Sequence, residues 1–228
     1  MRILFLTNRP YLPQKVGGAE SSTHEMIQAL ERRGHSCMVL SGFVATTNWL
    51  GLRNRVRRKI LRHKAPTDYV MGYPVSRTWK ISIALEKIKN SFQPDVAVLL
   101  PSNGGAYNLA KILHKENIPA VLHLRDVEFQ SLGNPNQMHL AGFIANSKFT
   151  AQAFEQKYGT RPTVIYNVFD RAQYECSAIG TYVTFINPIL LKGQAIALEL
   201  ARKNPDIPFL FVEGWQQKIE DKQSLLKK

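Results

Sequence analysis

The stretch RILFLTNRPYLPQKVGGAESSTHEMIQALERRGHSCMVL, residues 2–40, contains the clearest strand–helix–strand pattern of the chain. It opens with a short apolar run, Ile3–Thr7, that predicts a buried strand, and a turn-rich loop from Asn8 to Gly18 follows. Apolar residues then recur at spacings of three and four, which predicts a helix that ends at Gly34. A second apolar strand is expected at Cys37–Leu40. Strand, helix and strand in this order are typical of two parallel strands joined by a crossover helix.

The same alternation continues along the chain. Helices are expected at Ile81–Phe92, Ala106–Leu113 and Ser147–Tyr158, and strands at Val96–Leu100, Ala120–Leu124, Phe143–Ala145 and Val164–Tyr166. Short apolar strands that alternate with amphipathic helices indicate a parallel sheet covered on both faces. We therefore predict an α/β fold with a Rossmann-like parallel sheet and helices on both faces.

Two domains are predicted, at residues 1–172 and 173–228. The stretch Arg171–Gly180 shows no periodicity and is interpreted as a linker. One further strand–helix–strand unit follows within Val183–Val212. A single unit of this kind has too little core to be stable alone. It is therefore either the incomplete start of a second domain or a unit that packs on the first.

The composition is that of a soluble globular protein, with 44% hydrophobic and 21% charged residues in 228. No apolar run approaches the roughly 20 residues of a membrane-spanning helix, and the N-terminal run is too short for a signal peptide. Cys37 and Cys176 are two lone thiols without a metal-binding or redox spacing. We expect a cytoplasmic protein.

The charge is unusual, because the formal net charge is +13 and its excess is clustered. The first 100 residues contain 16 basic and 6 acidic side chains, and Arg53–Lys64 alone carries +7. A clustered excess of this kind indicates a polyanionic partner.

A helix over Thr47–Lys64 would align four apolar residues, Trp49, Leu52, Val56 and Ile60, on one face. An apolar stripe with tryptophan and a cationic remainder suits the surface of an anionic bilayer. Two alternatives remain open at this point. The stripe could pack on the sheet while the charges are merely solvated, or the segment could bind a phosphate-bearing glycan or nucleic acid.

The loop QKVGGAE, residues 14–20, joins the first expected strand to the first helix. Gly17 and Gly18 would permit a positive φ and a close backbone approach by a ligand, and the helix that starts near Ala19 offers free N–H groups. Such a site suits a diphosphate. Neither the dinucleotide-binding fingerprint nor a P-loop is present, and ordinary turn chemistry is the alternative.

The run AVLHLRD, residues 120–126, ends a strand in ionisable residues. Ligands of open parallel sheets bind beyond the carboxyl ends of the strands, which makes His123, Arg125 and Asp126 candidates for a site. Alternation places His123 and Arg125 on one face of the strand and Asp126 on the other. The alternative is a hydrogen-bonded core histidine, with Arg125 paired to Asp126.

Four motifs occur in a suggestive order: GGAE at residues 17–20, IANSKFT at 144–150, VIYNVFD at 164–170 and Lys192-Gly193. Together they resemble the family-4 glycosyltransferases of the two-Rossmann-domain (GT-B) class, over Met1 to about Trp215. The resemblance implies that the first domain holds the acceptor and that the second binds a nucleotide-sugar.

The resemblance also implies roles for single residues. Gly17, Gly18, Ala19 and Lys192 would hold the donor diphosphate. Asp126 would act near the acceptor hydroxyl, with His123 as the competing candidate.

Three departures from the family pattern stand out. The usual His-Asp of the first domain is Arg125-Asp126 here, with His123 two residues earlier. The usual Gly-Arg before the Lys-Gly is Ile186-Asn187, so a phosphate-clamping arginine is missing there. The family's paired glutamates would lie beyond residue 228.

The predicted function is that of a glycosyltransferase, or a fragment of one, that transfers a hexose from a nucleoside-diphosphate sugar to a glycan or lipid-linked acceptor. No metal, no other cofactor and no nucleic-acid partner are expected, and we expect the 228-residue chain alone to be inactive. Its expected location is the cytoplasm, peripheral on the inner face of the membrane through Trp49–Lys64. The alternative is a non-catalytic basic surface-binding module, or a degenerate remnant, on a Rossmann scaffold.

Overall fold

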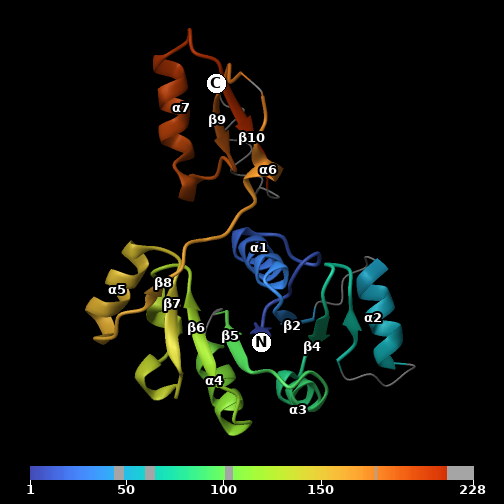
Figure 1. The fold of residues 1–228 in the computed structure, drawn as a ribbon. Coiled ribbons are helices and arrows are strands. Elements are labelled where there is room, and N and C mark those ends of the chain that lie inside the picture. Colours follow the sequence, from blue (N-terminus) through green and yellow to red (C-terminus); the bar gives the residue numbers. More distant parts are fainter. Residues whose placement is uncertain (44–48, 60–64, 101–104, 178, 215–228) are drawn as a thin grey trace. The chain divides into compact units, whose positions relative to one another are not determined.

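The structure is a computed structural model that describes residues 1–43, 49–59, 65–100, 105–177 and 179–214. It divides into two compact units, Met1–Asp170 and Arg171–Lys228 (Figure 1). Each unit is described by itself. No helix in the described part of the chain is long and apolar enough to span a bilayer.

The first unit is built on an eight-stranded sheet with the order β3-β4-β2-β1-β5-β6-β7-β8. All neighbouring strands are parallel except β3 and β4, which pair in antiparallel fashion at one edge. The strands are β1 (Arg2–Leu6), β2 (Ser36–Gly42), β3 (Thr67–Asp68), β4 (Val75–Thr78), β5 (Val96–Leu99), β6 (Ala120–Leu124), β7 (Gly142–Ala145) and β8 (Thr163–Val164). The predicted α/β class with a mainly parallel sheet is confirmed.

Helices cover both faces of this sheet. The helices of this unit are α1 (Gly18–Arg32), α2 (Trp49–Lys59), α3 (Ile81–Phe92), α4 (Ala106–Lys115) and α5 (Lys148–Tyr158). The chain passes from β1 through α1 to β2, and later returns through α3 to β5 on the other side of β1. The strand order therefore reverses between β1 and β5.

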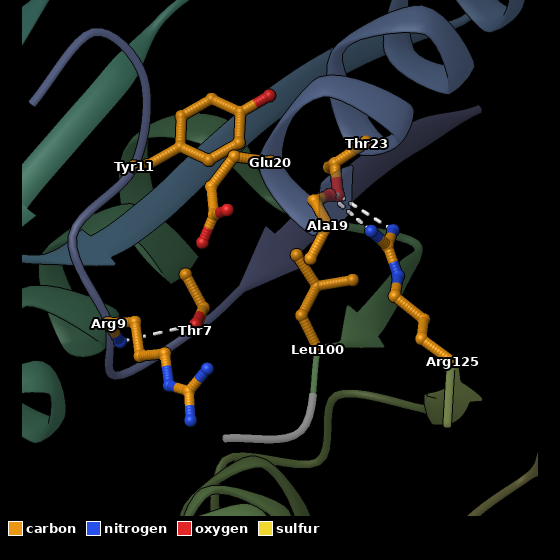
Figure 2. A pocket seen from close by; sticks show the side chains of 8 residues that line it. All are labelled: Thr7, Arg9, Tyr11, Ala19, Glu20, Thr23, Leu100 and Arg125. Atoms are coloured by element: carbon orange, nitrogen blue, oxygen red, sulfur yellow. Dashed lines mark hydrogen bonds between the residues drawn. The ribbon is translucent and has the colours of Figure 1, made fainter. Parts of the chain in front are cut away.

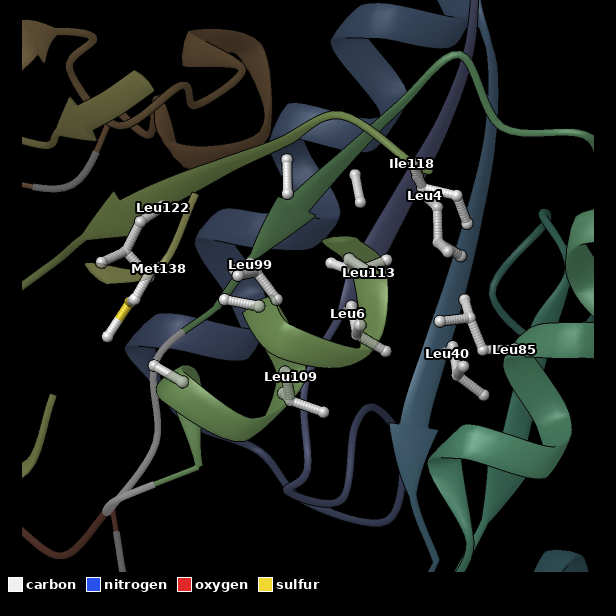
Figure 3. Close-up of a cluster of buried hydrophobic side chains, with 14 of the residues drawn as sticks. Leu4, Leu6, Leu40, Leu85, Leu99, Leu109, Leu113, Ile118, Leu122 and Met138 are labelled. Atoms are coloured by element: carbon white, nitrogen blue, oxygen red, sulfur yellow. The ribbon is translucent and has the colours of Figure 1, made fainter. Parts of the chain in front are cut away.

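The core has two halves because side chains alternate along β1. Leu4 and Leu6 pack with residues of α3, α4 and α5 in the larger cluster, part of which Figure 3 shows. Ile3 and Phe5 point to the opposite face and pack with Ile27 of α1. An apolar strand that is buried on both faces is thus the central strand of the sheet, as its composition predicts.

Helix ends follow the expected local chemistry. The Ser147 hydroxyl accepts a hydrogen bond from the Thr150 N–H at 3.0 Å and caps α5. Gly34 lies just after α1 with a φ of 81°, a left-handed conformation that glycine adopts without strain.

Two strands and one α-helix were not predicted, nor were the short 3₁₀ helices Phe129–Ser131 and Pro135–Gln137. The strand β4, with the sequence VSRT, contains Arg77, which is completely buried, and β3 has only two residues. Neither shows the apolar run that marks a buried strand. The stretch interpreted as a linker begins with a short helix, α6 (Arg171–Tyr174), none of whose residues is buried.

The second unit pairs β9 (Val183–Ile186) with β10 (Phe209–Val212) in parallel, and α7 (Gln194–Lys203) connects them. A 3₁₀ turn, Leu190–Lys192, precedes α7. The predicted strand–helix–strand order is confirmed.

Candidate functional site

A small pocket lies at the point where the strand order reverses. It has a volume of about 40 Å³ and is formed at the carboxyl ends of β1, β5 and β6 and at the start of α1 (Figure 2). Its lining residues are Thr7, Arg9, Tyr11, Ala19, Glu20, Thr23, Leu100 and Arg125. Open α/β sheets bind ligands at such switch points.

The two glycines of the loop differ in what surrounds them. A methyl group on Gly17 would lie 2.7 Å from Glu20 Oε2, whereas one on Gly18 would meet nothing within 4 Å. Gly17 has an extended φ of −172°, and Gly18 is not left-handed either, so the expected use of positive φ is wrong. Gly17 leaves room for the Glu20 carboxylate, and Gly18 leaves the start of α1 open to an incoming group.

Glu20 is a site residue that sequence reasoning missed. Its side chain is almost completely buried in the pocket wall, and its carboxylate pairs with Lys15 Nζ at 3.1 Å. The signal was present in the motif, because Glu20 stands three residues after Gly17, in the first turn of α1. A carboxylate in that turn is stabilised by the positive end of the helix dipole.

A buried arginine holds the loop that leads to the glycines. Arg77 Nε donates to Asp68 Oδ2 at 2.9 Å, and both side chains are completely buried. The other guanidinium nitrogens donate to the carbonyl oxygens of Tyr11 and Leu12 at 3.1 and 2.6 Å. The unpredicted strands β3 and β4 therefore position the loop between β1 and α1.

Tyr11 belongs to the same loop, and a chain of hydrogen bonds holds its hydroxyl in place. The hydroxyls of Tyr11 and Tyr73 lie 2.8 Å apart, and His24 Nδ1 lies 2.8 Å from the Tyr73 hydroxyl. Burial raises the pKa of Tyr11 to about 12 and raises that of Tyr73 as well. Both phenols are thus protonated at neutral pH.

Arg125 ties the end of β6 to the start of α1. Its guanidinium donates to the Ala19 carbonyl, to Ser22 Oγ at 2.8 Å and to Thr23 Oγ1 at 2.7 Å. Burial lowers its pKa to about 10, an effect that the nearby Glu20 carboxylate partly offsets, so it is still cationic at pH 7. The expected alternative of a pair with Asp126 is wrong, because these partners all lie in α1.

The two predicted catalytic candidates occupy different environments. His123 is completely buried, its Nδ1 lies 3.5 Å from Arg125, and its Nε2 has no hydrogen-bond partner among the described residues. Burial and then the Arg125 charge lower the pKa of His123 to about 3, so it is neutral at pH 7. Asp126 is exposed, and its Oδ1 accepts a hydrogen bond from the Glu128 N–H at 3.0 Å. Neither lines the pocket.

Lys192 lies in the second unit and is exposed at the start of α7. Gly193 after it has a φ of 86° and is the N-cap of the helix. The Lys-Gly pair is thus a turn into a helix N-terminus. Of the predicted binding residues, Gly17, Gly18 and Ala19 lie together in the first unit, and Lys192 lies in the other.

The fold and the pocket at the switch point define a Rossmann-like α/β protein. Residues 16–173, more than half of the chain, match the family model of Glycosyltransferase Family 4. The chain therefore belongs to this family, and the resemblance noted in its motifs is confirmed.

Solved structures share the fold at low sequence identity. Acinetobacter baumannii MurG matches at 12% identity with a TM-score of 0.51, covering 98% of this chain and 64% of its own. Staphylococcus aureus MnaA, solved with UDP, matches at 10% with a TM-score of 0.55, over 99% and 65%. A UDP-GlcNAc 2-epimerase from Neisseria meningitidis, bound to UDP-GlcNAc, matches at 12% with a TM-score of 0.51, over 99% and 68%. No curated protein sequence matches the chain.

The chain thus spans about two thirds of the length of these structures. They include glycosyltransferases and epimerases of the GT-B type. At 10–12% identity, these likenesses establish the fold alone.

Proposed function

We propose that this protein, alone or as part of a longer chain, transfers a hexose from a nucleoside-diphosphate sugar to a glycan or lipid-linked acceptor. The observation that carries the proposal is the family match over residues 16–173, which includes the glycine motif beside the switch-point pocket. Relatives of the same fold were solved with UDP or UDP-GlcNAc, which supports a nucleotide-sugar as the donor.

The start of α1 is the proposed contact for the donor diphosphate. Gly18 and Ala19 are exposed there, and no side chain would crowd a group that approaches Gly18. The free N–H groups and the partial positive charge of a helix N-terminus favour an anion. Lys192 in the second unit would add a charged hydrogen bond, and no resident metal is required because lysine and helix ends supply the positive charge.

Asp126 is the proposed group near the acceptor hydroxyl. It is exposed at the carboxyl edge of the sheet, one residue after the arginine that lines the pocket. His123 is the competing candidate, but its burial and its low pKa favour a structural role over proton transfer at neutral pH. A lipid-linked acceptor would place the protein in the cytoplasm, peripheral on the inner face of the membrane.

Ligand-detected NMR tests the donor site on the 228-residue chain. A panel of UDP, GDP and ADP, with their hexose conjugates, should reveal weak binding of at least one nucleotide. Gly18→Val should abolish that binding by filling the approach to α1. Lys192→Ala should weaken it by about 1.5–3 kcal/mol, the usual value of a hydrogen bond to a charged group. Lys111→Ala, an exposed site on α4, is the matched control.

The outcomes separate an enzyme from a non-catalytic binding module. If no nucleotide binds, or if Gly18→Val and Lys192→Ala both bind like the parent, the donor site is wrongly assigned and the module is favoured. Sugar transfer by the chain alone should be negligible when it is assayed with the same donors. Steady turnover would contradict that expectation and support a complete active site within these residues.

A further inference from the structure

The helix α2 presents its apolar residues to solvent. Trp49, Leu52 and Val56 are 67%, 57% and 44% exposed, respectively. With about 100° between successive residues of a helix, these three side chains share one face. The expected alternative, in which this stripe packs on the sheet, is therefore wrong for the described part of the helix; Ile60 lies outside the described residues.

The opposite face of α2 attaches it to the domain. Leu50 is 4% exposed and Asn54 is completely buried. Asn54 lies about 170° around the helix from the centre of the exposed stripe, and Leu50 about 130°. Arg57 donates a hydrogen bond to the Thr67 carbonyl of β3 at 2.8 Å, which ties the helix to the edge of the sheet. In Figure 1, α2 lies at the edge of the sheet that β3 and β4 form, at the opposite end from α5. The outward direction of the stripe is thus set by how the helix packs.

Cationic side chains flank the exposed stripe on both sides. Arg55 and Lys59, both exposed, lie along one side of it, and Arg53 lies along the other. The Arg53 guanidinium stands 4.9 Å from the centre of the Trp49 ring, within the range of a cation–π contact. The sequence contains no acidic residue between Glu31 and Asp68. The face therefore combines an apolar centre with a positive rim.

We propose that this face of α2 docks on the surface of an anionic lipid bilayer. Apolar side chains enter the boundary between headgroups and acyl chains, and the flanking cations meet the lipid phosphates. A second copy of the chain is a poor partner, because it would bring two clusters of like charge together. Nucleic acid would match the charge but would leave Leu52 and Val56 without a contact. The proposal does not rest on glycosyl transfer, since the face lies outside the switch-point pocket.

Co-sedimentation of the whole chain with vesicles tests the docking. Vesicles of phosphatidylcholine with 30% phosphatidylglycerol, as the probe, should bind the protein at low salt, and pure phosphatidylcholine vesicles should bind it far less. Each cation near an anionic surface contributes a factor of about five in binding. Arg55→Glu with Lys59→Glu should therefore weaken binding by at least about 25-fold. Lys111→Glu with Lys115→Glu on α4, two exposed lysines, changes the net charge equally and should weaken it much less.

A second pair of variants tests the apolar centre of the face. Trp49→Ser with Leu52→Ser should reduce vesicle binding, whereas Phe149→Ser, which removes an exposed ring from α5, should not. The parent should also show a blue shift of Trp fluorescence on anionic vesicles that Trp49→Phe lacks.

Several results would overturn the proposal: no binding to anionic vesicles at low salt, equal loss in the α2 and α4 charge variants, or a Trp49-dependent dimer in light scattering. Nucleotide binding in the same samples reports separately on the proposed function.

Discussion

The buried pair of Asp68 and Arg77 is the most informative place to perturb this fold. We expect Asp68→Ala to lower the free energy of unfolding by about 3 kcal/mol, at the low end of the 3–5 kcal/mol that breaking a buried ion pair costs. The low end applies because the guanidinium keeps its hydrogen bonds to the Tyr11 and Leu12 carbonyls, at 3.1 and 2.6 Å. Domains have a total stability of only about 5–15 kcal/mol, so the effect is large.

Removal of Arg77 instead of Asp68 should lower the free energy of unfolding further. Arg77→Met would leave the Asp68 carboxylate buried without its partner and would remove the donors from both loop carbonyls. We expect a loss of about 5 kcal/mol for this variant. The double variant Asp68→Leu with Arg77→Met removes both charges, and its loss should be smaller than that of Arg77→Met alone because no charge remains buried.

Urea unfolding followed by circular dichroism measures these losses. The matched control is Glu116→Gln, which breaks a partly exposed pair in which Lys89 Nζ lies 3.2 Å from the Glu116 carboxylate. Exposed pairs contribute about 0.2–1 kcal/mol. If Asp68→Ala costs no more than Glu116→Gln, then the Arg77–Asp68 pair does not hold the loop and the reasoning about the site's support is refuted.

Three further predictions concern the site. Gly17→Ala should push the Glu20 carboxylate from the pocket wall and weaken ligand binding with less than about 1 kcal/mol of lost stability, while Gly18→Ala should leave the Glu20 environment unchanged by NMR. The unfolded chain protonates His123 below about pH 6.5 and the folded chain only near pH 3. As the pH is lowered from about 6.5 to about 3, the free energy of unfolding should therefore fall by up to about 1.4 kcal/mol per pH unit. In an acid titration, the His123→Leu variant should lack this loss of stability. In an active enzyme that contains this chain, Asp126→Ala should lower kcat/KM by about 10²–10⁴-fold if it handles a proton, and an unchanged rate would remove it from the mechanism.

The alternation of strands and helices could be predicted from the sequence because it depends on neighbours in the chain. Apolar runs, such as Ile3–Leu6, mark strands that are buried on both faces, and a 3.6-residue period marks the helices between them. The cap at Ser147 and the end of a helix at Gly34 are equally local, since each depends on the conformation of a few residues. Each of the four motifs that carry the resemblance to the family is also contiguous in sequence.

The contacts that support and orient the candidate site join residues far apart in the sequence. Arg77 meets the carbonyls of the loop 65 and 66 residues earlier, and Arg125 meets the start of α1 more than 100 residues earlier. No local sequence pattern predicts such contacts. The sequence of β4, VSRT, contains a charged residue and no apolar run, so it resembles a loop. The orientation of the exposed stripe of α2 also depends on tertiary contacts. Periodicity places its three apolar residues on one face, but only the packing of Leu50 and Asn54 determines that this face meets the solvent.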